Sequence, residues 1–423
     1  MKLLEFPRIG EQCYEQRLPN GMLVRVVPKR GFARKYAFVA VDFGAIDTAF
    51  WQDGVRVRMP DGIAHYLEHK MFDLPEGSAD GMFAALGASP NAFTSYTMTA
   101  YHFSCTEHFA DNLRLLLRMV TTPYFTPESV EKERGIITQE IRMYEDSAEQ
   151  RAAEDLFAAL YKAHPVRVSI AGTAESIQDI TAQSLYDCFH AFYQPSNMVL
   201  CVTGDVDAQE VMDIAQAMTP NEALALPARD YGAPETMEPV KPRTKRRMEI
   251  SMPTFALGFK CEPAGQGMES MRREIIGDIA AEILVGESSP LYQKLYESGL
   301  IDGGFSVGYE SIKDACLISA NGDSDDPEAV LHAILQEGER IAREGFEEDL
   351  FRRLKKSALG RRTRDLDSFE SICYRICAYQ FDGVDYFSFP TAYASVTEAD
   401  VQEFLTGTIR PERAALSVVQ PKK

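Results

Sequence analysis

Short apolar runs of β type and longer segments with helical periodicity alternate along the first two hundred residues. The segment from Glu15 to Val27 predicts a strand, an Asn-Gly turn and a second strand, and residues 36–43 form another run typical of a strand. Apolar positions then recur three and four residues apart, which predicts helices. These expected helices cover residues 62–73, 79–87, 107–120, 126–146, 148–162 and 181–192. The pattern indicates that helices follow a sheet.

One of these helices has a well-marked start. Thr126, Pro127 and Glu128 combine an N-cap residue, a proline suited to the first turn and an early acidic side chain. We therefore expect a long helix from this point, running past Glu140 to about Asp146.

An order of elements recurs, once near the middle of the chain and once at its end. A helix, a proline turn and a buried strand that start at Thr181 are echoed from Thr397, with the turns at Pro195 and Pro411. The offset is the same for both pairs, since 397 − 181 and 411 − 195 both equal 216, and twice 216 is 432, close to the chain length of 423. The spacing favours a duplicated α+β unit, with a coincidence of common helix-strand order as the alternative.

The length of the chain exceeds what one hydrophobic core usually supports. Five prolines lie among polar and charged residues between Pro220 and Pro242, a composition typical of a linker. We predict an N-terminal domain of residues 1–222, a linker of residues 223–245 and a C-terminal domain of residues 246–423.

Composition and charge narrow the function classes. The chain is 45% hydrophobic and 25% charged, as expected for a globular protein, and its formal net charge is −19. This charge argues against binding to nucleic acid or to anionic membranes; it either serves solubility or favours basic peptides. No run of 18 apolar residues occurs and the opening residues lack a signal-peptide pattern, so we expect no membrane association and a cytoplasmic location.

The eight cysteines lie mostly in apolar stretches, where reduced and buried thiols are expected. Cys373 and Cys377 are four residues apart on an expected helix, so a metal-binding pair is the alternative for these two.

A His-x-x-Glu-His segment lies in the expected helix at residues 62–73. His65 and His69 are one turn apart on one face, a spacing that suits two ligands of one zinc ion. Glu68 lies beside that face, where a carboxylate can take a proton from the attacking water and pass it to a leaving amine. The motif has the order described for inverzincins. No role is assigned to the other histidines, at positions 102, 108, 164, 190 and 332.

A third ligand is expected because a catalytic zinc normally has three protein ligands and one open position. Glu133 and Glu140 lie seven residues apart on one face of the long helix, so one can bind the metal while the other supports it. Ordinary charge on a helix surface is the alternative for this pair.

With these segments, the chain resembles the insulinase and mitochondrial-processing-peptidase family of zinc peptidases, also called the pitrilysin family. The segment from His65 to His69 resembles the family's inverted zinc motif, and Glu133 with Glu140 resembles its Glu-x6-Glu element. The resemblance implies one zinc ion per chain, bound by His65, His69 and Glu140. It makes Glu68 the general base and Glu133 a supporting catalytic acid.

The resemblance extends to the binding of substrate. The segment from Asn91 to Thr94 is similar to the family's Asn-Ala-x-Thr element, an edge strand that receives a peptide by strand addition. Asn91 and Ala92 are therefore the candidate substrate-binding residues. Residues 165–177 and 193–198 also resemble family segments.

The family resemblance implies an α+β fold of two homologous domains, each a mainly antiparallel sheet packed with helices, which together form one half of a clamshell. Residues 1–222 would bind zinc and catalyse, and residues 246–423 would lack a metal site. In working members the opposite half supplies an Arg and a Tyr that hold the substrate, but here Tyr296 and Asp302 stand near those positions.

The missing Arg-Tyr pair predicts a partner. The chain is similar to the zinc-bearing subunit of bacterial processing-protease-like pairs, so we expect a heterodimer with a second family subunit, and a homodimer is the alternative. The expected function is zinc-dependent endopeptidase activity on unfolded peptides or small precursors. A non-catalytic scaffold or a peptide-binding subunit is the alternative.

Overall fold

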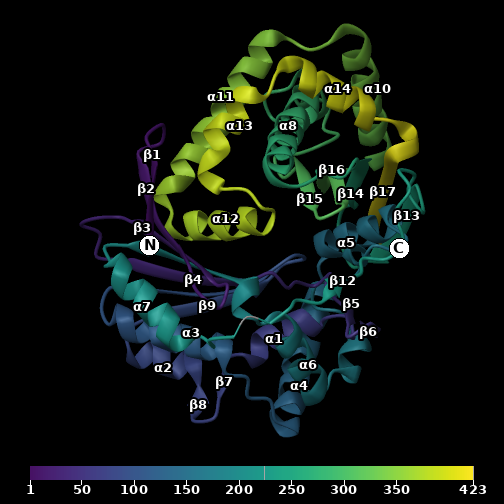
Figure 1. The fold of residues 1–423 in the computed structure, drawn as a ribbon. Coiled ribbons are helices and arrows are strands. Elements are labelled where there is room, and N and C mark those ends of the chain that lie inside the picture. Colours follow the sequence, from purple (N-terminus) through teal and green to yellow (C-terminus); the bar gives the residue numbers. More distant parts are fainter. Residues whose placement is uncertain (223, 423) are drawn as a thin grey trace. The chain divides into compact units, whose positions relative to one another are not determined.

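The computed structural model describes residues 1–222 and 224–422, and its contacts divide the chain into two compact units (Figure 1). The first unit comprises Met1–Ile141, Ser169–Tyr231 and Thr363–Phe387. The second comprises Arg142–Val168, Gly232–Arg362 and the described chain from Ser388 onwards.

Seven strands form the main sheet of the first unit. Their order is β1 (Lys2–Phe6), β2 (Glu11–Arg17), β3 (Leu23–Pro28), β11 (Met198–Gly204), β4 (Lys35–Val41), β10 (Thr99–Cys105) and β9 (Ser89–Thr94). All neighbours are antiparallel except β3 and β11. The predicted hairpin at the Asn-Gly turn is confirmed, with Arg17 paired to Leu23. Tyr101 and Phe103 on β10 are fully buried, so this sheet contributes to the core.

Smaller strands and most of the predicted helices complete the first unit. The strands are β12 (Ala228–Arg229), β5 (Ala49–Gln52) and β6 (Val55–Arg58) in one sheet, and β7 (Asp73–Leu74) and β8 (Gly77–Ser78) in another. The helices are α1 (Ile63–Lys70), α2 (Ala79–Ala85), α3 (Phe109–Thr121), α4 (Pro127–Glu145, whose last four residues belong to the second unit), α6 (Ala182–Phe192), α7 (Ala208–Met218) and α12 (Phe369–Phe381). The helices predicted up to residue 192 are confirmed, with ends shifted by a few residues.

The second unit contains a five-stranded sheet. Its order is β13 (Arg243–Met248), β17 (Ala414–Pro421), β14 (Thr254–Cys261), β16 (Ala315–Asp323) and β15 (Ser306–Ile312). Its helices are α5 (Ala148–Leu160), α8 (Gly267–Val285), α9 (Pro290–Glu297), α10 (Pro327–Glu344), α11 (Glu348–Arg364, which ends in the first unit), α13 (Phe389–Ser395) and α14 (Glu398–Thr408).

The two main sheets share one topology. The order β3-β11-β4-β10-β9 in the first corresponds to β13-β17-β14-β16-β15 in the second, and in each only the first pair is parallel. The recurring elements start at the same offset in both copies: the offset between the starts of α6 and α14 (398 − 182) equals that between the starts of β11 and β17 (414 − 198). The fold is α+β with two homologous, largely antiparallel halves.

The compact units do not coincide with the predicted domains. Helix α5, from residues 1–222, contacts β14 and β17 of the second unit, whereas α12, from residues 246–423, contacts β4 and β11 of the first. The predicted linker starts at residue 223, which lies outside the described residues, and it includes β12 and part of β13, both paired in sheets. Neither predicted domain is compact without a helix from the other, and the division into two repeats at the linker stays a prediction.

Two sequence-based expectations concern membrane-spanning helices and the state of the cysteines. Within residues 1–222 and 224–422, no helix is both long and apolar enough to cross a membrane. All eight cysteines are buried free thiols, and the sulfur atoms of Cys373 and Cys377 lie near the backbone carbonyls of Cys201 and Val199.

Candidate metal centre

Two glycines hold the start of α1 against a neighbouring loop. Gly62, the N-cap residue, has φ +89°, and a Cβ there would lie 2.4 Å from the carbonyl oxygen of Ala171. Gly172 has φ +74°, and a Cβ there would lie 2.4 Å from the carbonyl oxygen of Asp61. The Ser176 hydroxyl donates to that same Asp61 oxygen at 2.8 Å. Since only glycine allows such close backbone contact in left-handed conformations, this loop positions the helix that carries the site.

His65 and His69 project from α1 toward Glu140 on α4. Their Nε2 atoms lie 3.6 and 3.5 Å from the two carboxylate oxygens of Glu140. One possible ligand atom from each residue lies within 4.8 Å of the others, and no other such group occurs among the described residues. Ligand atoms about 2.0–2.1 Å from a tetrahedral zinc ion lie about 3.3 Å apart. The two imidazoles and the carboxylate therefore fit a zinc ion with small adjustments.

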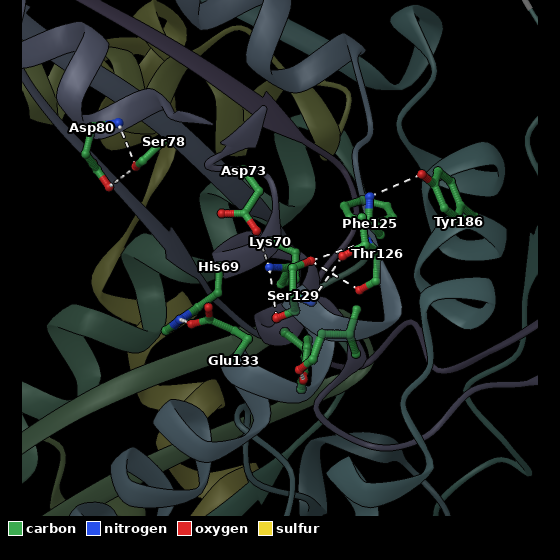
Figure 2. Close-up of polar contacts among 12 residues, drawn as sticks. His69, Lys70, Asp73, Ser78, Asp80, Phe125, Thr126, Ser129, Glu133 and Tyr186 are labelled. Atoms are coloured by element: carbon green, nitrogen blue, oxygen red, sulfur yellow. Dashed lines mark hydrogen bonds and ion pairs between the residues drawn. The ribbon is translucent and has the colours of Figure 1, made fainter. Parts of the chain in front are cut away.

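Glu133, on the same face of α4 as Glu140, contacts the other nitrogen of His69. Its Oε1 lies 3.0 Å from His69 Nδ1 (Figure 2), and this hydrogen bond lowers the pKa of Glu133. Burial lowers the pKa of His69, but the hydrogen bond to Glu133 and the charges of Glu68, Glu133 and Glu140 outweigh it and raise the pKa overall. A proton on Nδ1 shared with Glu133 leaves the Nε2 lone pair directed to the ligand group, as a metal requires.

Glu68 lies beside this group and is 8% exposed. Burial raises the pKa of its carboxyl, although His65 and a hydrogen bond from Thr94 oppose the rise. The Thr94 hydroxyl donates to Glu68 Oε2 at 2.8 Å. A buried carboxylate with a raised pKa holds a proton more readily near neutral pH, which suits a general base.

Asn91 and Ala92 lie on β9, the last strand of its sheet, as the resemblance predicts. The Ala92 N–H donates to the side chain of Asn91 at 2.9 Å. In an antiparallel pair, every second residue directs its N–H and C=O to the neighbouring strand, and the residues between them direct theirs outward. Because the Ala92 N–H donates to a side chain, Ala92 is assigned to the outward set. Pro90, two residues earlier, has no N–H to offer. The backbone of Ala92 therefore faces the open edge of the sheet.

Two residues near the site received no role from the sequence. Thr94 stands in the segment that resembles the substrate-binding strand, and this proximity was the available signal. Lys70 follows His69 directly and is 1% exposed. A lysine at a helix end ordinarily faces solvent, so its burial had no signal in the sequence.

The residues at the expected Arg and Tyr positions lie in the second unit. Tyr296 on α9 is 54% exposed, and its ring stacks on Tyr292 with centroids 6.1 Å apart. Asp302 accepts a hydrogen bond from the Gly304 N–H at 2.8 Å. The resemblance predicts an Arg where Tyr296 stands and a Tyr near Asp302, so neither residue offers the group expected at its position.

Known protein families match both halves of the chain. Residues 57–174 match the family model for insulinase (peptidase family M16), and residues 179–358 match that for the peptidase M16 inactive domain. The uncharacterized zinc protease YmfH of Bacillus subtilis (strain 168) is 36% identical over 431 residues, with 100% of both chains covered. The chain belongs to the M16 family.

Solved structures of M16 peptidases have the same fold as this chain. An M16-like peptidase from Alicyclobacillus acidocaldarius matches with a TM-score of 0.92 and 33% identity, covering 99% of this chain and 100% of that one. The periplasmic protease PqqL of Escherichia coli matches with a TM-score of 0.75 and 18% identity, covering 100% of this chain but 48% of PqqL. At that identity the match shows the fold alone. The chain spans about half the length of PqqL.

Proposed function

We propose that this M16 chain is a zinc-dependent endopeptidase, or the zinc-bearing subunit of one, that hydrolyses unfolded peptides or small precursors. The observation that carries the proposal is the convergence of His65, His69 and Glu140 beside Glu68. These three residues would hold one zinc ion, which when bound polarises the scissile carbonyl and makes water more acidic.

Glu68 is the proposed general base. Its carboxylate accepts a proton from the attacking water and donates that proton to the nitrogen of the leaving amine. Thr94 holds one carboxylate oxygen in place, and burial raises the proton affinity of the group. Glu133 orients His69 through Nδ1 and so supports catalysis without touching the substrate.

The substrate is proposed to add to β9 as an extended strand. β9 has an open edge because it is the last strand of its sheet, and there the Ala92 N–H is bonded to the exposed side chain of Asn91, which a substrate carbonyl would replace. Thr94, on the same strand, contacts Glu68, so a peptide paired with β9 would lie near the general base.

We infer that a partner completes the enzyme. Because Tyr296 and Asp302 replace the expected Arg and Tyr, a second family subunit is proposed to supply that pair, with a homodimer as the alternative. The cytoplasmic location stays a prediction, which fractionation of cells would test.

The proposal is tested by zinc content and peptide cleavage on the same preparations. We expect about one zinc per chain by elemental mass spectrometry, and less with Glu140→Gln. We expect Glu68→Gln to keep the metal and to lose cleavage of a fluorogenic peptide by about 10²–10⁴-fold. A wild type without metal, or cleavage indifferent to Glu68, would replace this proposal with the non-catalytic scaffold. Peptide binding that survives chelation, without cleavage, would favour a peptide-binding subunit.

A further inference from the structure

Lys70, the last residue of α1, is a fully buried cation next to the metal centre. Its side chain is 1% exposed, and it ion-pairs with Asp73 on β7. Its Nζ also donates to the backbone carbonyl of Ser129 at 3.2 Å (Figure 2). Lys70 thus joins the end of α1 to the first turn of α4.

A second side chain on the same face of α1 makes a parallel contact. Tyr66, one turn before Lys70, donates its hydroxyl hydrogen to the carbonyl oxygen of Val130. Tyr66 and Lys70 therefore contact adjacent carbonyls at the start of α4, while His65 and His69 on the neighbouring face contact its carboxylates.

The start of α4 is itself well defined. The Ser129 N–H donates to the hydroxyl of Thr126 at 3.1 Å, and the Phe125 N–H donates to the hydroxyl of Tyr186 at 3.1 Å (Figure 2). A displacement at this end would therefore be passed to the helix as a whole rather than absorbed by a frayed turn.

Ser129, Glu133 and Glu140 lie in one line along α4. At about 100° per residue, Glu133 and Glu140 are rotated by about 40° and 20° from Ser129, so all three face α1. With a rise of about 1.5 Å per residue, Glu140 lies about 16 Å from Ser129, and a tilt of about 4° at Ser129 would move Glu140 by about 1 Å. Metal–ligand distances vary by only about 0.2 Å, so a tilt of this size at Ser129 would disturb ligand placement.

The charge of Lys70 is not needed to fill space. An apolar side chain of similar volume at a buried ion-pair position is often as stable, because burying a charge has a large desolvation cost. What the ammonium group adds is a directed bond to one carbonyl of α4 and one carboxylate of β7. These two directed contacts indicate that Lys70 aligns α1 with α4.

We propose that Lys70 is a positioning residue that aligns α4 with α1 and so sets the zinc affinity of His65, His69 and Glu140. The inference rests on the proposed function, since it requires the site to bind zinc. Lys70 touches neither metal nor substrate, and it acts through the placement of Glu133 and Glu140.

The test measures zinc affinity by competition with a chromophoric chelator, together with the melting temperature of the zinc-free protein. We expect Lys70→Met to weaken zinc binding about 10–100-fold, the usual range for residues that support metal ligands. Lys29→Met is the matched control, because Lys29 also joins one carboxylate, that of Glu11, and one backbone carbonyl, that of Leu366. It should lower the melting temperature while leaving zinc affinity within about twofold.

Two further variants separate alignment from simple destabilisation. In a Glu140→Gln background, Lys70→Met should weaken zinc binding much less than in the wild type, because one of the two carboxylates that Lys70 places is already lost. If Lys70→Met fails to fold, Asp73→Asn carries the test, since Asp73 is half-exposed and its loss should weaken zinc binding in the folded protein.

The outcomes distinguish the two proposals. Wild type that binds no zinc would overturn the proposed function and the role of Lys70 with it. Wild type that binds zinc, with folded Lys70→Met or Asp73→Asn binding it equally well, would overturn only the role of Lys70.

Discussion

Glu68 and Glu133 are the same residue type in different surroundings. Burial raises the pKa of Glu68, whereas the hydrogen bond with His69 lowers the pKa of Glu133. Titratable groups whose surroundings separate their pKa values commonly have different tasks. The environment of the two carboxylates thus agrees with a base at Glu68 and a charged orienting group at Glu133.

The spacing of His65, Glu68 and His69 could be interpreted from the sequence because one turn of helix joins them. Glu133 and Glu140 are far along the chain, so their assignment depended on the family resemblance. The hydrogen bond from Thr94 to Glu68 was not predictable, because it depends on how β9 lies beside α1.

A histidine outside the site is expected to affect acid stability. Burial lowers the pKa of His164 to about 4, assisted by Lys260 and opposed by Asp314 and Glu235. The unfolded chain, with a His pKa of about 6.5, binds more protons between these values, so stability falls as the pH drops from about 6.5 to 4. The full effect is about 3 kcal/mol.

Urea unfolding midpoints between pH 4.5 and 7 measure this contribution. His164→Gln should make the midpoint fall less steeply on acidification than in the wild type. His332→Gln, at an exposed position, should follow the wild-type slope. An unchanged slope in His164→Gln would show that other groups cause the acid sensitivity.

At the scale of elements, the contact between the start of α1 and the loop at residues 171–176 determines where the helix of the candidate metal centre begins. The sequence predicted α1 and α4 well, because periodicity and capping residues are local signals. It did not predict the two facing glycines, since their close contact joins segments more than a hundred residues apart.

Two glycine substitutions test this contact. Gly172→Ala and Gly31→Ala both place a side chain at positive φ, which costs about 1–2 kcal/mol. A Cβ at position 31 meets no atom within 4 Å, whereas one at position 172 meets the Asp61 carbonyl at 2.4 Å. We expect Gly172→Ala to lower the melting temperature clearly more and also to weaken zinc binding. Equal melting temperatures and equal zinc affinities in the two variants would contradict this role of the loop.

At the scale of the whole molecule, equivalent helices are exchanged between the two compact units. The offset between the first residues of α5 and α12 (369 − 148) is close to the offset of the repeat (398 − 182). Each of these helices packs on the sheet of the unit formed mainly by the other half of the sequence. A cut at the predicted linker would therefore remove α12 from β4 and β11.

We expect residues 1–222 alone to aggregate or to unfold without a cooperative transition. Six side chains of α12 are buried, which represents on the order of 10 kcal/mol and equals the stability of a typical domain. Circular dichroism melts and size-exclusion chromatography would show this, and co-expression with residues 223–423 should restore the fold. A monomeric 1–222 fragment that melts cooperatively at the full-length temperature would contradict the expectation.

The sequence by itself determined the α+β class, the offset of the repeat, the helices up to residue 192 with a few of the strands, and the residues of the candidate zinc motif. These features depend on periodicity, capping and spacing within one element, which neighbouring residues along the chain specify. Only the tertiary structure decided the exchange of α5 and α12, the contact of Gly62 with Gly172, the hydrogen bond of Thr94 and the burial of Lys70. Each of these joins segments distant in sequence, and their contacts arise from packing that no local pattern records.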